Sequence, residues 1–323
     1  MKTKCFSAGS SGTAAAGGNE SGINEPVPRA ALPATGCGRK RGCMHFTKMQ
    51  GIGNDYVYID GSKERPADVS KTAVMVSDRH FGIGSDGLIL INPSDKADFE
   101  MEMYNADGSR GQMCGNGIRC VGKYVYDHGL TKKTTITVDT LAGVKTLRLA
   151  LGEDGRVSAV RVDMGEPVLK PEDIPVNLPG DRAVAVPKAF GNILYEITCV
   201  SMGNPHCVIF PGQDIKDMDL EKIGPVFEND PVFPERVNTE FINVVNDHEI
   251  RMRVWERGSG ETWACGTGAC AAAVASALNG YTGTEVTVHL LGGDLQIEWD
   301  RDNTNHVFMT GPAAEVFEGD INV

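Results

Sequence analysis

Two long stretches of the chain carry the same pattern of apolar and polar positions. In each, short segments rich in β-branched and aromatic residues are separated by Gly, Asp or Pro. This pattern predicts short strands joined by turns. The expected strands are residues 56–60, 87–91, 99–104, 134–140 and 144–149 in the first stretch, and 195–200, 207–210, 241–245, 250–256, 285–290 and 295–299 in the second.

Helices are fewer, and we expect them at 67–79, 117–128 and 268–279. The first has an amphipathic pattern, whereas residues 269–278 have almost no polar side chain. A helix that is apolar all round is buried on all sides, here by strands that wrap around it. The pattern therefore predicts an α+β fold of two domains, each a barrel-like, mostly antiparallel sheet around a central helix.

The two stretches are related by an internal repeat. Met-Cys-Gly-Asn-Gly around Cys114 returns as Ala-Cys-Gly-Thr-Gly around Cys265, and each cysteine stands 15 residues before a glycine that can end a helix. Asn54 lies 60 residues before the first cysteine, and Asn204 lies 61 before the second. A repeat this long indicates duplication of a whole domain, because solenoid repeats span only about 20 to 50 residues.

The repeat also sets the expected domain boundaries. We expect a first domain at 44–163, completed by a C-terminal strand at 310–323, and a second domain at 164–309. Residues 1–43 are rich in Gly, Ala and Ser and show no periodicity, so we expect a disordered extension there. An over-extended start and a transit peptide both fit that composition.

The composition restricts the classes of ligand. A chain of 323 residues with 41% hydrophobic and 23% charged residues is typical of a globular protein. The net charge of −12 argues against nucleic acid, and no run approaches the roughly 18 apolar residues of a membrane helix. Nine cysteines are too few for a disulfide scaffold and favour a reducing, cytoplasmic location. We expect a small-molecule substrate, and a homodimer stays open.

The repeated cysteine turns suggest acid/base chemistry. A thiol just ahead of a helix N-terminus is expected to have a lowered pKa, because unpaired N–H groups and the helix dipole favour negative charge there. The N–H groups of Gly115, Asn116, Gly266 and Thr267 would suit a carboxylate. If the two turns face each other, one thiolate can remove a proton while the opposite thiol donates one, which inverts a stereocentre. Cys120, Cys199, Cys207 and Cys270 are expected to be buried apolar residues.

Six ordered motifs carry a resemblance to a known family. They are residues 49–55 (MQGIGND), 105–109 (NADGS), 113–120 (MCGNGIRC), 202–206 (MGNPH), 235–238 (ERVN) and 256–262 (ERGSGET) continuing to 265–269 (CGTGA). From Met44 to Val323 the chain resembles diaminopimelate epimerases. The resemblance implies interconversion of L,L- and meso-diaminopimelate, in lysine and peptidoglycan precursor synthesis, without pyridoxal phosphate, metal or other cofactor.

The resemblance also implies residue roles. Cys114 and Cys265 match the two acid/base thiols, with Cys114 as the base toward the L,L substrate. Glu256 and His206 match residues beside the cysteines, and His206 is expected to support them. Arg119 and Asp55 could equally be structural ion-pair partners. The positions that match substrate contacts are Asn54, Asn105, Asn204, Asn238 and Arg257.

Other functions remain open at this stage. A proline or hydroxyproline racemase would share the fold and the paired thiols, although the Glu256-Arg257-Gly258 segment favours a substrate with a polar far end. A non-catalytic zinc or redox protein is disfavoured, because the cysteine spacings differ from Cys-x-x-Cys. A dinucleotide site at residues 266–271 is also disfavoured, since no apolar strand precedes it.

Overall fold

The computed structural model describes residues 43–322, to which all structural statements refer. The helices are α1 (Val69–Ser77), α2 (Gly115–Asp127), α3 (Leu220–Glu228) and α4 (Gly266–Leu278), with short 3-10 turns at Pro171–Asp173 and Ile215–Asp217. The strands of the first half are β1 (Cys43–Gly51), β2 (Asn54–Asp60), β3 (Gly87–Asn92), β4 (Phe99–Asn105), β5 (Arg110–Gly111), β6 (Thr135–Asp139), β7 (Lys145–Leu151) and β8 (Val157–Gly165). Those that follow are β9 (Val186–Phe190), β10 (Ile193–Ser201), β11 (Pro205–Ile209), β12 (Asn238–Asn246), β13 (Glu249–Glu256), β14 (Gly260–Thr262), β15 (Glu285–Leu290), β16 (Gly293–Trp299), β17 (Val307–Gly311) and β18 (Ala314–Asn322).

The strand pairings repeat in the two halves. In the first half the hydrogen-bonded order is β8, β7, β6, β4, β3, β2, β1 and β18, with β5 added to β4. In the second half it is β17, β16, β15, β13, β12, β11, β10 and β9, with β14 added to β13. The parallel pairs occupy equivalent places in both orders, at β2–β3 and β4–β6 and at β11–β12 and β13–β15. The expected duplication of a mostly antiparallel α+β domain is therefore confirmed.

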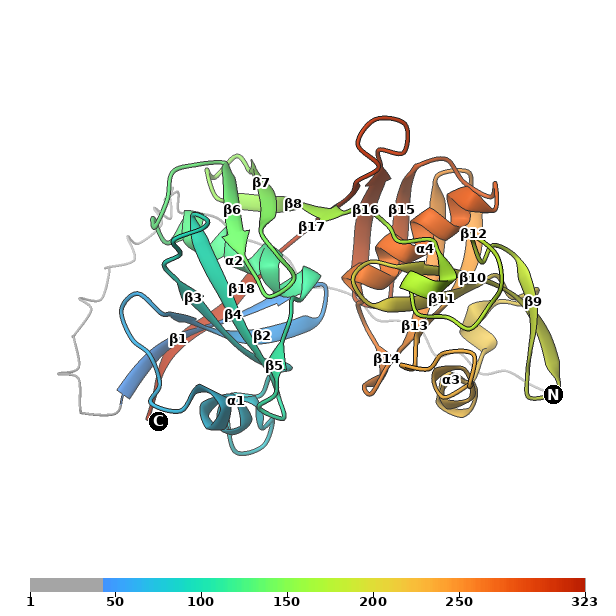
Figure 1. Cartoon of the computed structure of the whole chain (residues 1–323). Helices are drawn as coiled ribbons and strands as arrows, with labels where there is room; N and C mark the ends of the chain where they lie inside the picture. The colour runs from blue at the N-terminus through green and yellow to red at the C-terminus, as the bar shows by residue number, and fades with distance from the viewer. Residues whose placement is uncertain (1–42, 323) are drawn as a thin grey trace, which may run out of the picture. The chain divides into compact units, whose positions relative to one another are not determined.

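Each half surrounds one helix with its sheet (Figure 1). Helix α2 contacts strands β1, β2, β7, β8 and β18, and α4 contacts β10 to β13 and β15 to β17. Eight of the first eleven residues of α4 are small, and Ala269 to Ala275 are all buried. Small side chains let strands approach the helix from several sides without overpacking. The other two helices, α1 and α3, cover smaller apolar clusters of their own.

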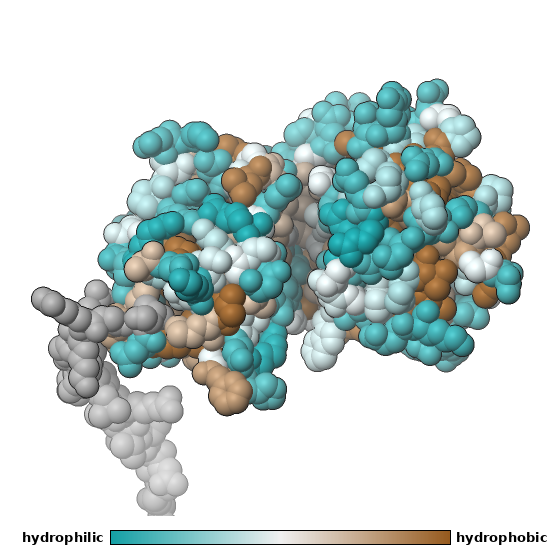
Figure 2. Space-filling view, turned by 60° about the horizontal axis from the view of Figure 1, so that its bottom comes forward, coloured by the Kyte–Doolittle hydropathy of each residue, from teal (hydrophilic) through white to brown (hydrophobic). Residues whose placement is uncertain are grey.

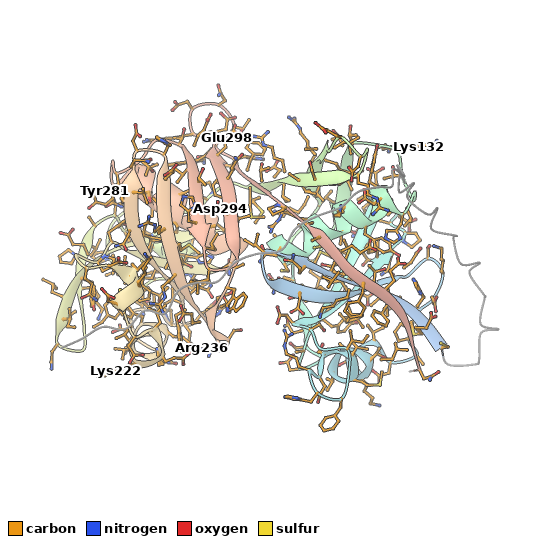
Figure 3. The ribbon with its side chains drawn as sticks, turned by 180° about the vertical axis from the view of Figure 1, so that it is seen from behind. Lys132, Lys222, Arg236, Tyr281, Asp294 and Glu298 are labelled. Carbon is orange, nitrogen blue, oxygen red and sulfur yellow. The ribbon has the colours of Figure 1, made fainter. Side chains whose placement is uncertain are left out.

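The chain's last described strand returns to its first. Strand β18 pairs antiparallel with β1, seen in Figure 1 as the red strand beside the blue one, and Cys43, expected in the extension, already pairs with Asn322. Antiparallel pairing of β8 with β17 joins the two ladders. Across this junction Arg161 lies 2.6 Å from Glu298, which Figure 3 labels. The boundaries proposed for the two domains stay a prediction.

The strands and helices expected from the pattern are all present, with ends that differ by a few residues. Strands β1, β5, β8, β9, β14 and β17 and helix α3 were not predicted. Hydrophilic residues cover most of the face shown in Figure 2, with scattered apolar patches. Within residues 43–322 no helix is long and apolar enough to cross a membrane. The expectations for residues 1–42 lie outside the described residues.

Candidate active site

Cys114 and Cys265 hold the same position at the start of α2 and α4. Each is the N-cap residue, with extended backbone angles of φ −122° and ψ 119° for Cys114 and φ −124° and ψ 108° for Cys265. Each Sγ accepts a hydrogen bond from the third helical residue, from Gly117 N at 3.3 Å and from Gly268 N at 3.4 Å. The sulfur thus replaces the oxygen of a usual Ser or Asp cap. Both thiols therefore lie where a helix offers its unpaired donors.

The two helix starts meet each other. A Cβ built on Gly266 would lie 3.5 Å from Gly115 Cα, and one built on Gly115 would lie 3.7 Å from Gly266 Cα. Asn116 Nδ2 donates to the carbonyl of Ala264 at 3.2 Å, which ties the first turn to the residue before Cys265. The positive ends of two helix dipoles thus face one another, an arrangement that a bound anion would stabilise.

The expected lowering of the cysteine pKa values is wrong for this structure. Burial raises the pKa of Cys114, and the hydrogen bonds from the N–H groups of Gly117 and Asn116 only partly oppose it. Burial raises the pKa of Cys265 further, and the carboxylates of Glu256 and Glu240 add to the rise. The helix start favours the thiolate as expected, but loss of hydration outweighs it.

Asn54 bonds the first thiol, and Asp86 orients Asn54. The Cys114 thiol donates to Asn54 Oδ1 at 3.2 Å, and Asn54 Nδ2 donates to Asp86 Oδ2 at 2.7 Å. This second bond fixes which end of the amide faces the sulfur. Tyr56 lies close by: burial raises its pKa well above the usual range, and the neighbouring Cys114 adds to this effect. Asn54, an expected substrate contact, thus bonds the Cys114 thiol directly.

A buried histidine and carboxylate stand beside the second thiol. His206 and Glu240 are both fully buried, with His206 Nδ1 2.7 Å from Glu240 Oε1. The other ring nitrogen lies 3.0 Å from Asn204 Oδ1. A Cβ built on Gly268 would lie 2.6 Å from Glu240 Oε1 and 3.1 Å from Cys265 Sγ, so carboxylate and thiol flank the same glycine.

The carboxylate of Glu256 acts on both thiols, since it raises the pKa of Cys114 and of Cys265. Burial raises its own pKa, and hydrogen bonds with Thr262 and Cys265 oppose that rise. Thr262 Oγ1 donates to Glu256 Oε1. Thr267 Oγ1 lies 3.6 Å from Cys265 Sγ. The expected residues of the second turn are therefore brought together around Cys265.

Three expected substrate contacts are engaged with other protein groups. Asn238 is buried, its Nδ2 donates to Pro205 O at 3.0 Å, and its Oδ1 accepts from Arg257 N at 3.0 Å. The Arg257 side chain donates to a backbone carbonyl, that of Glu235, at 2.8 Å. Asn105 ends β4 and donates to Ser109 Oγ at 2.9 Å. The structure thus shows Asn238 holding the backbone of Arg257, while direct substrate contact by these three stays a prediction.

Asp55 and Arg119 have different surroundings. Asp55 pairs with Lys48 and with Arg79, at 2.5 and 2.8 Å, so the structural ion-pair interpretation is confirmed for it. Arg119 has no solvent-exposed surface, and it bonds backbone carbonyls instead of a carboxylate. The ion-pair interpretation is therefore wrong for Arg119.

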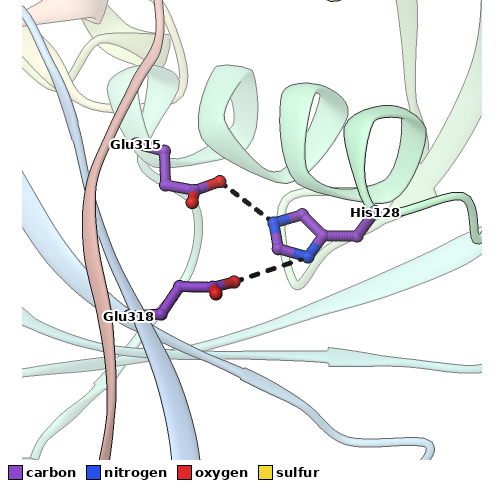
Figure 4. A group of neighbouring side chains, drawn as sticks. All are labelled: His128, Glu315 and Glu318. Carbon is purple, nitrogen blue, oxygen red and sulfur yellow. Dashed lines mark hydrogen bonds and ion pairs between the residues drawn. The ribbon is translucent and has the colours of Figure 1, made fainter. Parts of the chain in front are cut away.

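One group of side chains among residues 43–322 has the spacing of metal ligands (Figure 4). His128 Nε2 lies 3.0 Å from Glu315 Oε2, and His128 Nδ1 lies 3.7 Å from Glu318 Oε1. His128 caps the C-terminal end of α2, whereas Cys114 caps its N-terminal end. Because these are partly exposed groups that also form ordinary ion pairs, the cluster does not by itself indicate a metal site.

Comparison with known proteins identifies the family. The family model for diaminopimelate epimerase matches residues 46–170 and 198–316. The chain belongs to the diaminopimelate epimerase family. It is 58% identical over 287 residues to the diaminopimelate epimerase of Agathobacter rectalis, covering 87% of this chain and all of that one. It is 60% identical over 283 residues to that of Desulfovibrio desulfuricans, covering 86% of this chain and 98% of that one. The chain is therefore an isomerase.

Solved structures of lower identity share the fold of this epimerase family member. A phenazine biosynthesis protein of the PhzF family from Bacillus anthracis superimposes with a TM-score of 0.62 at 16% identity, over 87% of this chain and 99% of that one. A hydroxyproline epimerase from Agrobacterium vitis gives 0.61 at 14% identity, over 88% and 94%. At these identities the likeness concerns the fold alone, and the closer relatives favour diaminopimelate over the proline racemase alternative.

Sequence reasoning missed Glu240, Asp86 and Tyr56 in this epimerase site. Glu240 lies inside β12, is fully buried, and stands between the buried residues Thr239 and Phe241. A carboxylate within a buried strand is a signal for a buried ionic site. Starting the predicted strand at residue 241 placed Glu240 in a loop and hid that signal.

Proposed function

We propose that Cys114 and Cys265 are the acid/base pair with which this epimerase interconverts L,L- and meso-diaminopimelate. The observation that carries the proposal is the meeting of two cysteine-capped helix starts at Gly115 and Gly266. Two thiols that lie close together at helix starts of opposite halves suit a carbon that must lose a proton on one face and gain one on the other.

The reacting carbon needs stabilisation when its proton leaves. The Cys114 thiolate would take the α-proton of the L,L substrate, and the electron pair of the C–H bond would spread into the adjacent carboxylate. N–H groups of Gly115, Asn116, Gly266 and Thr267 lie at helix starts and would bind that carboxylate as its charge grows. The Cys265 thiol would then deliver its proton to the opposite face. The reverse reaction exchanges the two roles.

The far end of the substrate requires polar partners. A distal ammonium and carboxylate are matched by amide, carboxylate and guanidinium groups. Asn105, Asn204, Asn238, Glu256 and Arg257 are the candidates, and His206 would support Asn204 and Glu240. Glu256 disfavours the thiolate form of both cysteines, so it would oppose ionisation of both at the same time. A homodimer is a further expectation that the described chain leaves open.

The test is turnover of L,L-diaminopimelate by Cys114→Ala and Cys265→Ala, with Cys199→Ala as the matched control. Cys199 is a buried cysteine of the apolar cluster beneath α3, outside the thiol site. We expect epimerisation to fall by at least about 10³-fold in each thiol variant, since a positioned acid or base contributes about 10² to 10⁴, and to persist in Cys199→Ala. Turnover near the wild-type rate in either thiol variant would overturn the proposal.

A further inference from the structure

The two halves differ in the charged groups that stand behind their thiols. Five residues after each cysteine the halves have Arg119 and Cys270, both with no exposed surface. A Cβ built on Gly117 would meet Ile89 Cδ1 at 2.8 Å, whereas one built on the equivalent Gly268 would meet Glu240 Oε1 at 2.6 Å. Near Cys114 these two positions thus hold the Arg119 cation and Ile89. Near Cys265 they hold the Cys270 thiol and the Glu240 carboxylate.

Arg119 is a buried cation without an anionic partner. Its Nη1 donates to Gly115 O at 3.1 Å and its Nε to Pro312 O at 3.2 Å, with Met309 Sδ 3.7 Å from Nη1. Its Nη2 has no hydrogen-bond partner among residues 43–322. Burying a charge is costly unless another charge compensates it. An anion that forms nearby would therefore be stabilised.

The bond from Arg119 to Gly115 also orients the donor side of the first helical turn. The carbonyl of Gly115 belongs to the same trans peptide as the N–H of Asn116, and the two point in opposite directions. Pulling the carbonyl toward the guanidinium therefore directs that N–H toward the helix start. The N–H of Asn116 is one of the two backbone donors that favour the Cys114 thiolate. In the second half, Cys270 has no guanidinium to do the same.

The space for the guanidinium is made by glycines. A Cβ on Gly51, in β1, would lie 3.0 Å from Arg119 Nη2, and one on Gly311, in β17, would lie 3.2 Å from Nε. Gly51 ends β1 of the first half, and Gly311 ends β17 of the second half. The Arg119 side chain is therefore enclosed by both halves of the chain. Its position is therefore fixed relative to the turn.

Other groups around Cys114 do not supply a positive charge. Asn54 accepts from the thiol and so favours its protonated form. Two charged groups act on this thiol with opposite sign: Glu256 disfavours the thiolate and Arg119 favours it. The Asp86 carboxyl group bonds Asn54 and carries no positive charge. Further ionisable groups near the thiol are Tyr56, Tyr58 and Cys120, each with a pKa raised first of all by burial. They are uncharged near neutral pH.

We propose that Arg119 is a positioning residue that makes the two thiols unequal, so that Cys114 loses its proton more readily than Cys265 before the L,L substrate binds. It acts by its buried charge and by orienting the Gly115–Asn116 peptide, without touching the substrate. The proposal rests on the two-thiol function above.

The test is the pH dependence of Cys114 alkylation by iodoacetamide, followed by mass spectrometry of the modified peptide in a Cys265→Ala background of the full chain. Alkylation reports the thiolate and needs no turnover. We expect Arg119→Met to raise the midpoint by about one pH unit or more, and Arg119→Lys to restore part of that shift. Arg161→Met, which removes an arginine from β8, is the matched control and should leave the midpoint unchanged.

Gly51→Ala gives a second measurement if Arg119→Met does not fold. Its Cβ would displace Nη2 while keeping the charge in the protein, so we expect a smaller rise of the same midpoint. In otherwise wild-type protein, Arg119→Met should lower kcat more than it changes KM. An unchanged alkylation midpoint in folded Arg119→Met, or in Gly51→Ala if only that variant folds, would overturn the proposal. That result differs from failure of the two-thiol function, in which Cys114→Ala would still epimerise.

Discussion

Asn116 donates from its side-chain amide to the carbonyl of Ala264, so the residue two positions after Cys114 holds the residue just before Cys265. The bond spans 148 positions of the chain and is buried. The Oδ1 atom of Asn116 has no hydrogen-bond partner among residues 43–322. Since the donor joins the two turns directly, we regard this bond as the contact that sets the spacing of the two thiols.

Removing this contact should lower both the stability and the activity of the protein, and the two losses can be measured separately. Asn116→Ala leaves a buried carbonyl unpaired, which costs about 1 to 3 kcal/mol of unfolding free energy. Asn116→Asp keeps the size but loses the donor. We expect both variants to lower kcat by more than tenfold while remaining folded, as measured by urea denaturation and epimerisation assays. Wild-type kcat in a folded Asn116→Asp would contradict this role.

Gly268 should tolerate no side chain. An added Cβ would lie 2.6 Å from Glu240 Oε1 and 3.1 Å from Cys265 Sγ, so one of these groups must move. Because Gly268 is helical, alanine there should cost little through the backbone. We expect Gly268→Ala to reduce kcat by about 10² or more, since misplacing a reacting group by about 1 Å has that effect. Gly212→Ala, where a Cβ would meet nothing within 4 Å, is the control; equal activity of the two variants would refute the prediction.

Glu102 should make stability depend on acid pH. Burial alone would raise its pKa, but hydrogen bonds from Arg65, Asn92 and Tyr104 and the charge of Arg110 lower it to about 2. A lowered pKa in the folded state means that the stabilisation is present above the unfolded pKa of about 4.5 and is lost as pH falls toward 2. After allowance for solvent screening we expect about 1 to 2 kcal/mol. Denaturation of Glu102→Gln should show this deficit at pH 7 and little of it near pH 2, whereas a deficit independent of pH would contradict it.

The duplicated fold could be predicted because its signals are local. The cysteine turns, the strand-like runs and the apolar helix ahead of Leu278 all lie within short windows of sequence, and the repeat relates them. Strands β8 and β17 were missed, and their pairing with each other, which spans 142 to 151 positions, has no local signal. The sequence pattern also cannot show that the two ladders join there.

The residues of the candidate site could be predicted from the sequence, but the direction of the cysteine pKa shifts could not. Cys114 and Cys265 were found by their repeated context, and both are helix caps as expected. Their pKa shifts had the opposite sign, because burial and the approach of Glu240 depend on tertiary packing. The sequence around Arg119 is compatible with an ion pair, and its backbone carbonyl partners follow only from the tertiary fold.

The most direct measurement of the two-thiol account follows deuterium during early turnover of L,L-diaminopimelate in heavy water. Because one thiol removes the substrate proton and the other delivers a solvent-derived one, the first meso product should carry α-deuterium while the remaining L,L pool stays unlabelled. α-Deuterium appearing equally fast in the unconverted L,L pool would show that one group serves both faces and would contradict the account.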